Sequence, residues 1–164
     1  MFPWTLSGSR PANHPQRRIG ALATIAADFS AFQRLCTPDH LDDLADYLSS
    51  LKHPYWSSYV TLPSAPSKSP MALMGRDRIH EFIINHILPG EGSERAWQLY
   101  LTRPGTQAGA RVLSIHQRLL GKRKDAAAFL KRAWHHQALL QIHEDLCFRH
   151  SCCVCSLLEH MKGV

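Results

Sequence analysis

The sequence predicts an all-α protein, an irregular multi-helix bundle with an internal loop rich in proline and serine and a cysteine-rich C-terminus. Apolar residues recur at three- and four-residue steps through most of the 164 residues, which is the period of a helix with one buried face. No segment sustains the alternation of apolar and polar residues that is typical of a strand. A chain of this length is expected to form one helical domain over residues 1–164.

The first helix is expected to begin near Pro15, after an extended lead-in formed by residues 1–14. Prolines at positions 11 and 15 favour extended backbone in the residues that precede them. The apolar residues predicted to face the core are Leu22, Ile25, Phe29 and Phe32.

A second helix is predicted from Thr37-Pro38-Asp39. The Thr37 hydroxyl can accept a hydrogen bond from a first-turn amide, and a proline at the first helical position sacrifices no hydrogen bond. Its predicted buried side consists of Leu41, Leu44, Leu48 and Leu51. The pattern breaks at His53-Pro54, and residues 62–70, with three prolines and three serines, are predicted to form a loop.

The second half of the chain is expected to be helical as well, because caps and stop signals divide its apolar pattern into segments. These segments are 79–87, ended by Pro89-Gly90; 93–101; 108–119, between a Thr106 cap and Gly121; 125–133, capped by Asp125; and 137–146.

The composition indicates a basic cytoplasmic protein. Its formal net charge of +6 at pH 7 favours polyanionic partners such as nucleic acid, because binding releases counterions, although many basic proteins bind no polyanion. No apolar run is long enough to cross a membrane, and the N-terminus lacks the pattern of a signal peptide. Four of the five cysteines lie within nine residues, which is unlike the spread cysteines of a disulfide-stapled secreted protein.

Basic residues at the start of the first helix form a candidate site for nucleic acid or another anion. Arg10, Asn13, Arg17 and Arg18 lie where free helix amides and arginine donors can converge on a phosphate. The alternative is a capped helix entry with solvated arginines. A second basic cluster, Lys122-Arg123-Lys124, is interpreted as a solvated loop or as a phosphate contact.

The C-terminal cysteines form a candidate metal site. Cys147, Cys152 and Cys155 follow a C-x4-C-x2-C pattern that suits structural Zn²⁺, and His143, one turn before Cys147, is the predicted fourth ligand. Competing fourth ligands are Cys153, His150 and His160. The same spacing also suits an iron–sulfur cluster, for which Cys36 is the remaining distant cysteine. The third interpretation is free thiols without a metal, since free cysteine packs as a small hydrophobe.

No catalytic motif is evident. The chain has no serine in a nucleophile elbow and no GxxxxGK[ST] loop, and His80-Glu81 lacks the second histidine of a metalloprotease helix. Catalytic activity of this chain alone is therefore not expected.

Several segments together resemble the C-terminal portion of an uncharacterised bacterial family, domain of unknown function 2851. They are Arg10 to Pro15 with Arg18; Tyr55-Trp56; residues 75–89; and Gln137 to Ile142 with the following Cys147, Cys152 and Cys155. The resemblance implies a longer architecture, whose N-terminal acidic and Glu-x-His-type motifs suggest a nuclease-like α/β core that has no counterpart in this chain.

The resemblance and the basic charge together suggest a helical accessory module, stabilised by metal, which contacts nucleic acid beside a nuclease-like N-terminal domain or partner chain. The alternative is a structural or protein-interaction module that binds no nucleic acid and uses an exposed aromatic patch of Tyr55, Trp56 and Tyr59.

Overall fold

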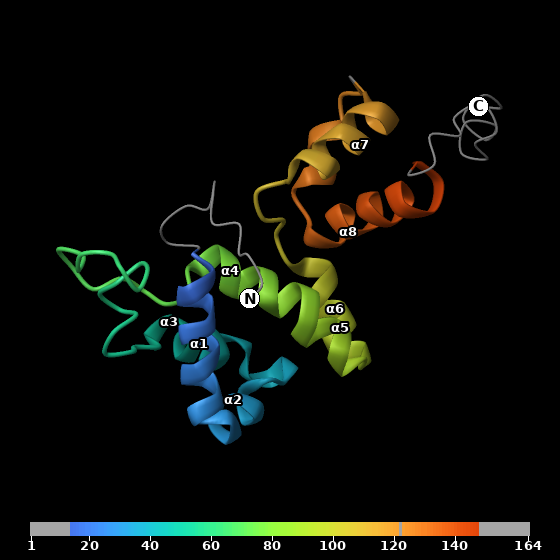
Figure 1. Cartoon of the computed structure of the whole chain (residues 1–164). Helices are drawn as coiled ribbons and strands as arrows, with labels where there is room; N and C mark the ends of the chain where they lie inside the picture. Colours follow the sequence, from blue (N-terminus) through green and yellow to red (C-terminus); the bar gives the residue numbers. More distant parts are fainter. Residues whose placement is uncertain (1–13, 122, 148–164) are drawn as a thin grey trace. The chain divides into compact units, whose positions relative to one another are not determined.

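The computed structural model describes residues 14–121 and 123–147, and the chain is all-α, as predicted (Figure 1). Those residues form helices and no β-strand, apart from an isolated bridge between Pro104 and Arg132. No helix among them combines the length and apolarity needed to cross a bilayer. Contacts divide the chain into two compact units, Met1–Ala96 (unit 1) and Trp97–Val164 (unit 2). The sequence did not predict this boundary, because it falls inside a helix rather than in a linker.

Unit 1 consists of helices and one long non-helical segment, residues 51–75, between α3 and α4 (Figure 1). Helix α3 packs against both α2 and α4. Leu41, Leu44, Leu48 and Leu51 are all buried, so the predicted inner side of this helix is confirmed. The elements are α1 (Pro15–Ala27), α2 (Phe29–Leu35), η2 (Pro38–His40), α3 (Leu41–Ser50), α4 (Arg76–Phe82), η3 (Ile83–Ile87), α5 (Leu88–Glu91) and the first turn of α6 (Glu94–Thr102).

Helix α1 begins at Pro15 as predicted, but it ends at Ala27, and the predicted buried face is confirmed only in part: Ile25 is buried and Phe32, in α2, is half-buried. Leu22 is 62 % exposed and Phe29 is 55 % exposed. The residues that α1 buries are Arg17, Gly20, Ala21 and Ile25. Small residues on this side allow Trp56 to approach the helix backbone at Gly20, so the packing partner and not the apolar stripe decides which face is inside.

Two helix ends also differ from the predictions. The Thr37 hydroxyl is buried and makes no hydrogen bond within the described part of the chain, so it does not cap η2. The helix expected to end at Pro89-Gly90 instead continues through α4, η3 and α5 to Glu91. The π-helical turns of η3 precede Pro89 and accommodate its missing N–H. The helix ends at Gly92, whose φ of 71° lies in the left-handed region.

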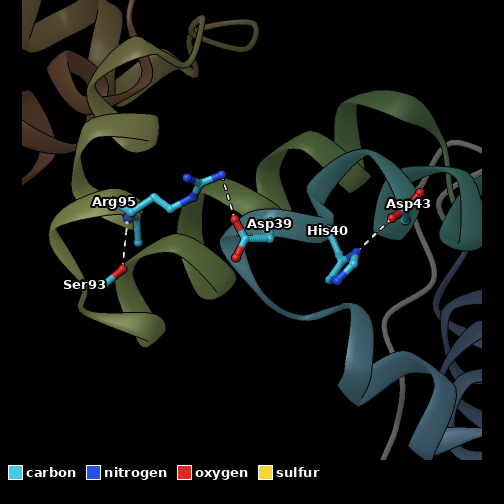
Figure 2. Close-up of polar contacts among 6 residues, drawn as sticks. Asp39, His40, Asp43, Ser93 and Arg95 are labelled. Atoms are coloured by element: carbon cyan, nitrogen blue, oxygen red, sulfur yellow. Dashed lines mark hydrogen bonds and ion pairs between the residues drawn. The ribbon is translucent and has the colours of Figure 1, made fainter.

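Polar contacts hold the first turn of α6 within unit 1 (Figure 2). The Ser93 hydroxyl accepts a hydrogen bond from the Ala96 amide at 3.1 Å and so caps this helix, and Arg95 pairs with Asp39 at 2.6 Å. Both partners of the ion pair are largely exposed, so it contributes at most about 1 kcal/mol.

Unit 2 contains the rest of α6 and a pair of packed helices, α7 and α8 (Figure 1). Its core cluster is formed by Val112, Ile115, Leu139 and Cys147. Neither expected cap is present, because α7 starts after Gly109 rather than at Thr106, and the Asp125 side chain does not cap η4. The remaining elements are α7 (Ala110–Leu120), η4 (Ala126–Leu130), α8 (Ala133–Ile142) and the π-helical η5 (His143–Cys147).

Candidate functional site

Arg17, one of the predicted anion-binding residues, is a buried side chain with 1 % exposure. Its Nε donates to the Trp56 carbonyl at 3.2 Å, and its Nη2 donates to the carbonyls of Met71 at 3.5 Å and Ala72 at 2.8 Å. Burial lowers the pKa of this guanidinium, but from so high a value that it stays charged at neutral pH. Arg17 therefore ties two parts of the 51–75 segment to α1, and anion binding by this residue stays a prediction.

The other predicted anion-binding residues lie elsewhere. Arg18 is exposed and lines a small pocket together with Arg78. The N-cap of α1 is His14, whose Nδ1 accepts a hydrogen bond from the Gln16 amide at 3.4 Å. Arg10 and Asn13 lie outside the described residues. The structure thus directs Arg17 and Arg18 to different environments, one interior and one at the surface.

The positive charge of the chain is concentrated in unit 2. Residues 1–96 contain nine Lys and Arg against nine Asp and Glu, whereas residues 97–164 contain ten against four. The entire formal surplus of +6 therefore belongs to unit 2. A polyanion is attracted by the local surplus of charge, so unit 2 and not the start of α1 is the better candidate surface.

Backbone hydrogen bonds pair two short segments of unit 2 that each carry basic residues. The Gly105 amide donates to the Lys131 carbonyl at 2.8 Å, and the Ala133 amide donates to the Arg103 carbonyl at 3.1 Å. The Arg132 guanidinium also donates to the Thr102 carbonyl. We call Arg103, Lys131 and Arg132 the basic cluster; Lys131 and Arg132 are exposed and Arg103 is half-buried.

Aromatic rings accompany the basic cluster. Trp97 is 53 % exposed and its ring stacks on Tyr100 with centroids 5.6 Å apart, one helical turn before Arg103. Trp134, which follows Lys131 and Arg132 in the sequence, lies against His135 with ring centroids 3.8 Å apart. We call the basic cluster together with Trp97, Tyr100 and Trp134 the basic-aromatic face.

The His135 imidazole, which follows Trp134, has a pKa below its ordinary value. Burial is the main cause of this lowered pKa; a hydrogen bond with the Phe129 backbone opposes it, and the charge of Arg132 adds to the lowering. His136 is buried and its Nε2 lies 3.0 Å from the Leu130 carbonyl oxygen, where it donates a hydrogen bond. The lowered pKa of His135 disfavours a positive charge on this ring.

The second basic cluster predicted from the sequence is divided. Arg123 makes two hydrogen bonds with Asp125, both at 3.0 Å, and this partner raises the pKa of its guanidinium. Lys124 is exposed, and Lys122 lies outside the described residues. The pairing with Asp125 offsets one charge of this cluster.

Only part of the predicted metal site can be placed. His143 and Cys147 occupy the two ends of η5, and Cys147 is buried in the apolar core cluster of unit 2. Cys152 and Cys155 lie outside the described residues, as do Cys153, His150 and His160. Within residues 14–121 and 123–147, no three His, Cys, Asp or Glu side chains come together as a metal site.

Cys36, the distant cysteine considered for an iron–sulfur cluster, belongs to unit 1. Its thiol donates to the Phe32 carbonyl at 3.2 Å, and burial raises the pKa of the thiol. Both effects favour the protonated form, which is not a metal ligand.

Inspection of the sequence missed the basic-aromatic face. Arg103 and Arg132 are far apart along the chain, and each stands in an unremarkable local context. The net charge of each half of the sequence could have pointed to this part of the chain, because the excess of Lys and Arg over Asp and Glu can be located without knowledge of the fold.

Together, the fold and this site define a helical protein with one neutral and one basic unit. The family model described as "Protein of unknown function (DUF2851)" matches residues 1–100, more than half of the chain. The chain belongs to this family, as the resemblance predicted. The match covers unit 1 and ends before Arg103, so the basic cluster lies outside it. No curated protein and no solved structure matches the chain.

Proposed function

We propose that this chain is a cytoplasmic helical accessory module that contacts nucleic acid through the basic-aromatic face of unit 2, beside a nuclease-like domain or partner. The observation that carries the proposal is the concentration of the whole positive surplus in unit 2. Lysines and arginines that neutralise phosphates release counterions, which supplies the binding free energy.

The neighbouring rings favour single-stranded nucleic acid. Bases stack on exposed aromatic side chains when they are not paired in a duplex, and an arginine beside such a ring holds the backbone phosphate. Trp97 in α6 and Arg103, which directly follows this helix, supply an exposed ring and an arginine within one short stretch of the chain. A single strand of a few nucleotides is therefore the proposed ligand.

Replacing Arg103, Lys131 and Arg132 together by glutamine should weaken binding of a labelled single-stranded oligonucleotide about tenfold or more, because up to three phosphate contacts are lost. Fluorescence anisotropy with the full 164-residue chain measures this. The magnitude of the salt slope of log K should fall by about 2 for the loss of three contacts.

The matched control removes the same charge from unit 1. Arg34, Lys52 and Lys68 are exposed, and their triple glutamine variant has the same net charge as the first variant. It should keep the wild-type affinity within about twofold, since its charges are not part of the proposed contact. Equal losses in both variants, or no binding by the wild type, would refute the proposal.

A protein-interaction module remains the alternative, and one observation favours it. Ile19, Leu22 and Phe29 are each more than half exposed, which leaves apolar surface on α1 and the start of α2. The predicted aromatic patch contributes less to the exposed apolar surface. The rings of Tyr55 and Tyr59 stack on each other with centroids 4.2 Å apart, and both residues are half-buried. A chain without affinity for nucleic acid would support this function.

We also propose that Cys147, Cys152 and Cys155 bind structural Zn²⁺ with His143. The spacing of the three cysteines supports this, and so does the position of His143 in the same π-helical segment as Cys147. The apolar surroundings of Cys147 instead favour a free thiol.

Metal analysis of anaerobically purified protein should find about one equivalent of zinc per chain if the proposed four-ligand site exists. Cys152→Ser/Cys155→Ser should then lower both the zinc content and the melting temperature, because metal binding is coupled to folding. A brown chromophore would indicate an iron–sulfur cluster. A folded, metal-free protein whose melting is unaffected by these substitutions would leave only free thiols.

A further inference from the structure

Unit 1 contains a pocket of about 210 Å³ that the nucleic-acid proposal does not use. It lies between α1 and the residues that lead into α4. Its apolar lining is formed by Ala21, Leu22, Leu73 and Met74, and two arginines, Arg18 and Arg78, complete it. The pocket therefore combines a mostly apolar wall with two cationic groups.

One wall of this pocket is held in place by Arg17. The guanidinium of Arg17 binds the carbonyls of Met71 and Ala72, immediately before Leu73 and Met74. Because the Arg17 side chain is itself buried and its donor is charged, these bonds fix the backbone that carries the wall to α1. Arg17 is thus a positioning residue for the pocket and does not line it.

The two lining arginines are available to a ligand to different degrees. Arg18 makes no side-chain hydrogen bond or ion pair with the residues that the structure describes. Arg78 uses Nη1 to bind Glu81 at 2.8 Å, which leaves its other N–H donors, and half of the side chain is exposed. Asp77 next to Arg78 is exposed and does not line the pocket.

We propose that this pocket binds a small flat organic anion, an aromatic ring that carries a carboxylate or a phosphate group. The ring would pack on Leu22, Leu73 and Met74, since a thioether makes favourable contacts with aromatic rings. The anionic group would bind the planar guanidinium groups, which match carboxylate and phosphate geometry. The volume is smaller than that of typical drug-sized sites, so one ring system with its anion fills it.

The test is a titration of the full chain, labelled with ¹³C at its methionine methyl groups, with phenyl phosphate, benzoate and inorganic phosphate. Met74 lines the pocket, and its signal is assigned with the Met74→Leu variant. A saturable shift of the Met74 methyl with either ring-bearing anion is expected, and the tighter of the two identifies the anionic group. Saturation by phosphate alone to the same extent, or no saturable shift, would overturn the proposal.

Arg18→Gln and Arg78→Gln should each weaken binding of the ring-bearing anion about tenfold, the value of one charge-assisted contact. Arg76→Gln is the matched control, because Arg76 is exposed, close in sequence and not part of the lining. An equal loss in the Arg76 variant would mean that general positive charge, and not this pocket, binds the anion. The glutamine variants of the basic cluster should leave the Met74 shifts unchanged, so a failure here is distinct from a failure of the nucleic-acid proposal.

Discussion

Replacing Arg17 by methionine should lower the free energy of unfolding by about 2 kcal/mol, because the change removes hydrogen bonds from a charged donor to three partly buried carbonyl groups. The affected carbonyls belong to Trp56, Met71 and Ala72, and all three lie in the segment that Arg17 ties to α1. Methionine keeps much of the volume of the side chain but donates no hydrogen bond. Urea denaturation followed by circular dichroism measures the loss.

The neighbouring arginine provides the matched control. Arg18→Met removes the same chemical group from an exposed position and should change the free energy of unfolding by less than about 0.5 kcal/mol. The loss of unfolding free energy in Arg17→Lys should lie between those of the two methionine variants. A lysine ammonium group on its flexible chain cannot donate to three separate carbonyls in the way that a planar guanidinium does. If Arg17→Met and Arg18→Met were equally stable, the bracing role of Arg17 would be untenable.

Gly20→Ala should destabilise the chain by about 2 kcal/mol, although alanine is the better helix former. A Cβ atom at this position would lie 2.2 Å from Cδ1 and 2.6 Å from Cγ of Trp56. The indole is rigid, so it would have to move away from α1 together with the loop that carries it. Thermal or urea unfolding measures the effect, and the emission of Trp56 should shift as its ring becomes more exposed.

A second helical glycine separates this clash from ordinary helix propensity. Gly90 lies in α5, and a Cβ atom there would meet nothing within 4 Å. Gly90→Ala should therefore stabilise the chain, by up to about 1 kcal/mol. A stabilising Gly20→Ala would show that Trp56 does not pack against this face of α1.

The predictions from sequence succeeded where a local pattern is sufficient. The four leucines of α3 are spaced so that a single helix brings them to one side, and all four are buried. The start of α1 at Pro15 follows from the chemistry of proline at a first helical turn. The order of short motifs in the sequence also predicted the family, and the match of the family model over residues 1–100 shows that the chain belongs to it.

The same reasoning failed for α1 and for the candidate site. Leu22 and Phe29 have helical spacing, but the helix is interrupted at Asp28, so they lie in different helices, and both are exposed because spacing does not show which surface another element covers. Arg17 and Arg18 are adjacent and identical in type, yet one is buried and the other exposed. No local property of the sequence distinguishes them.

The sequence by itself determined the helical fold class, the net charge and its location in the second half of the chain, because these depend on residue type and short-range spacing. Only the tertiary structure decided that Trp56 packs on Gly20, that Arg17 lies inside, and that Pro104 pairs with Arg132. Each of these is a contact between residues distant in the chain. Which surface is buried depends on the element that covers it, and the covering element is a property of the whole fold.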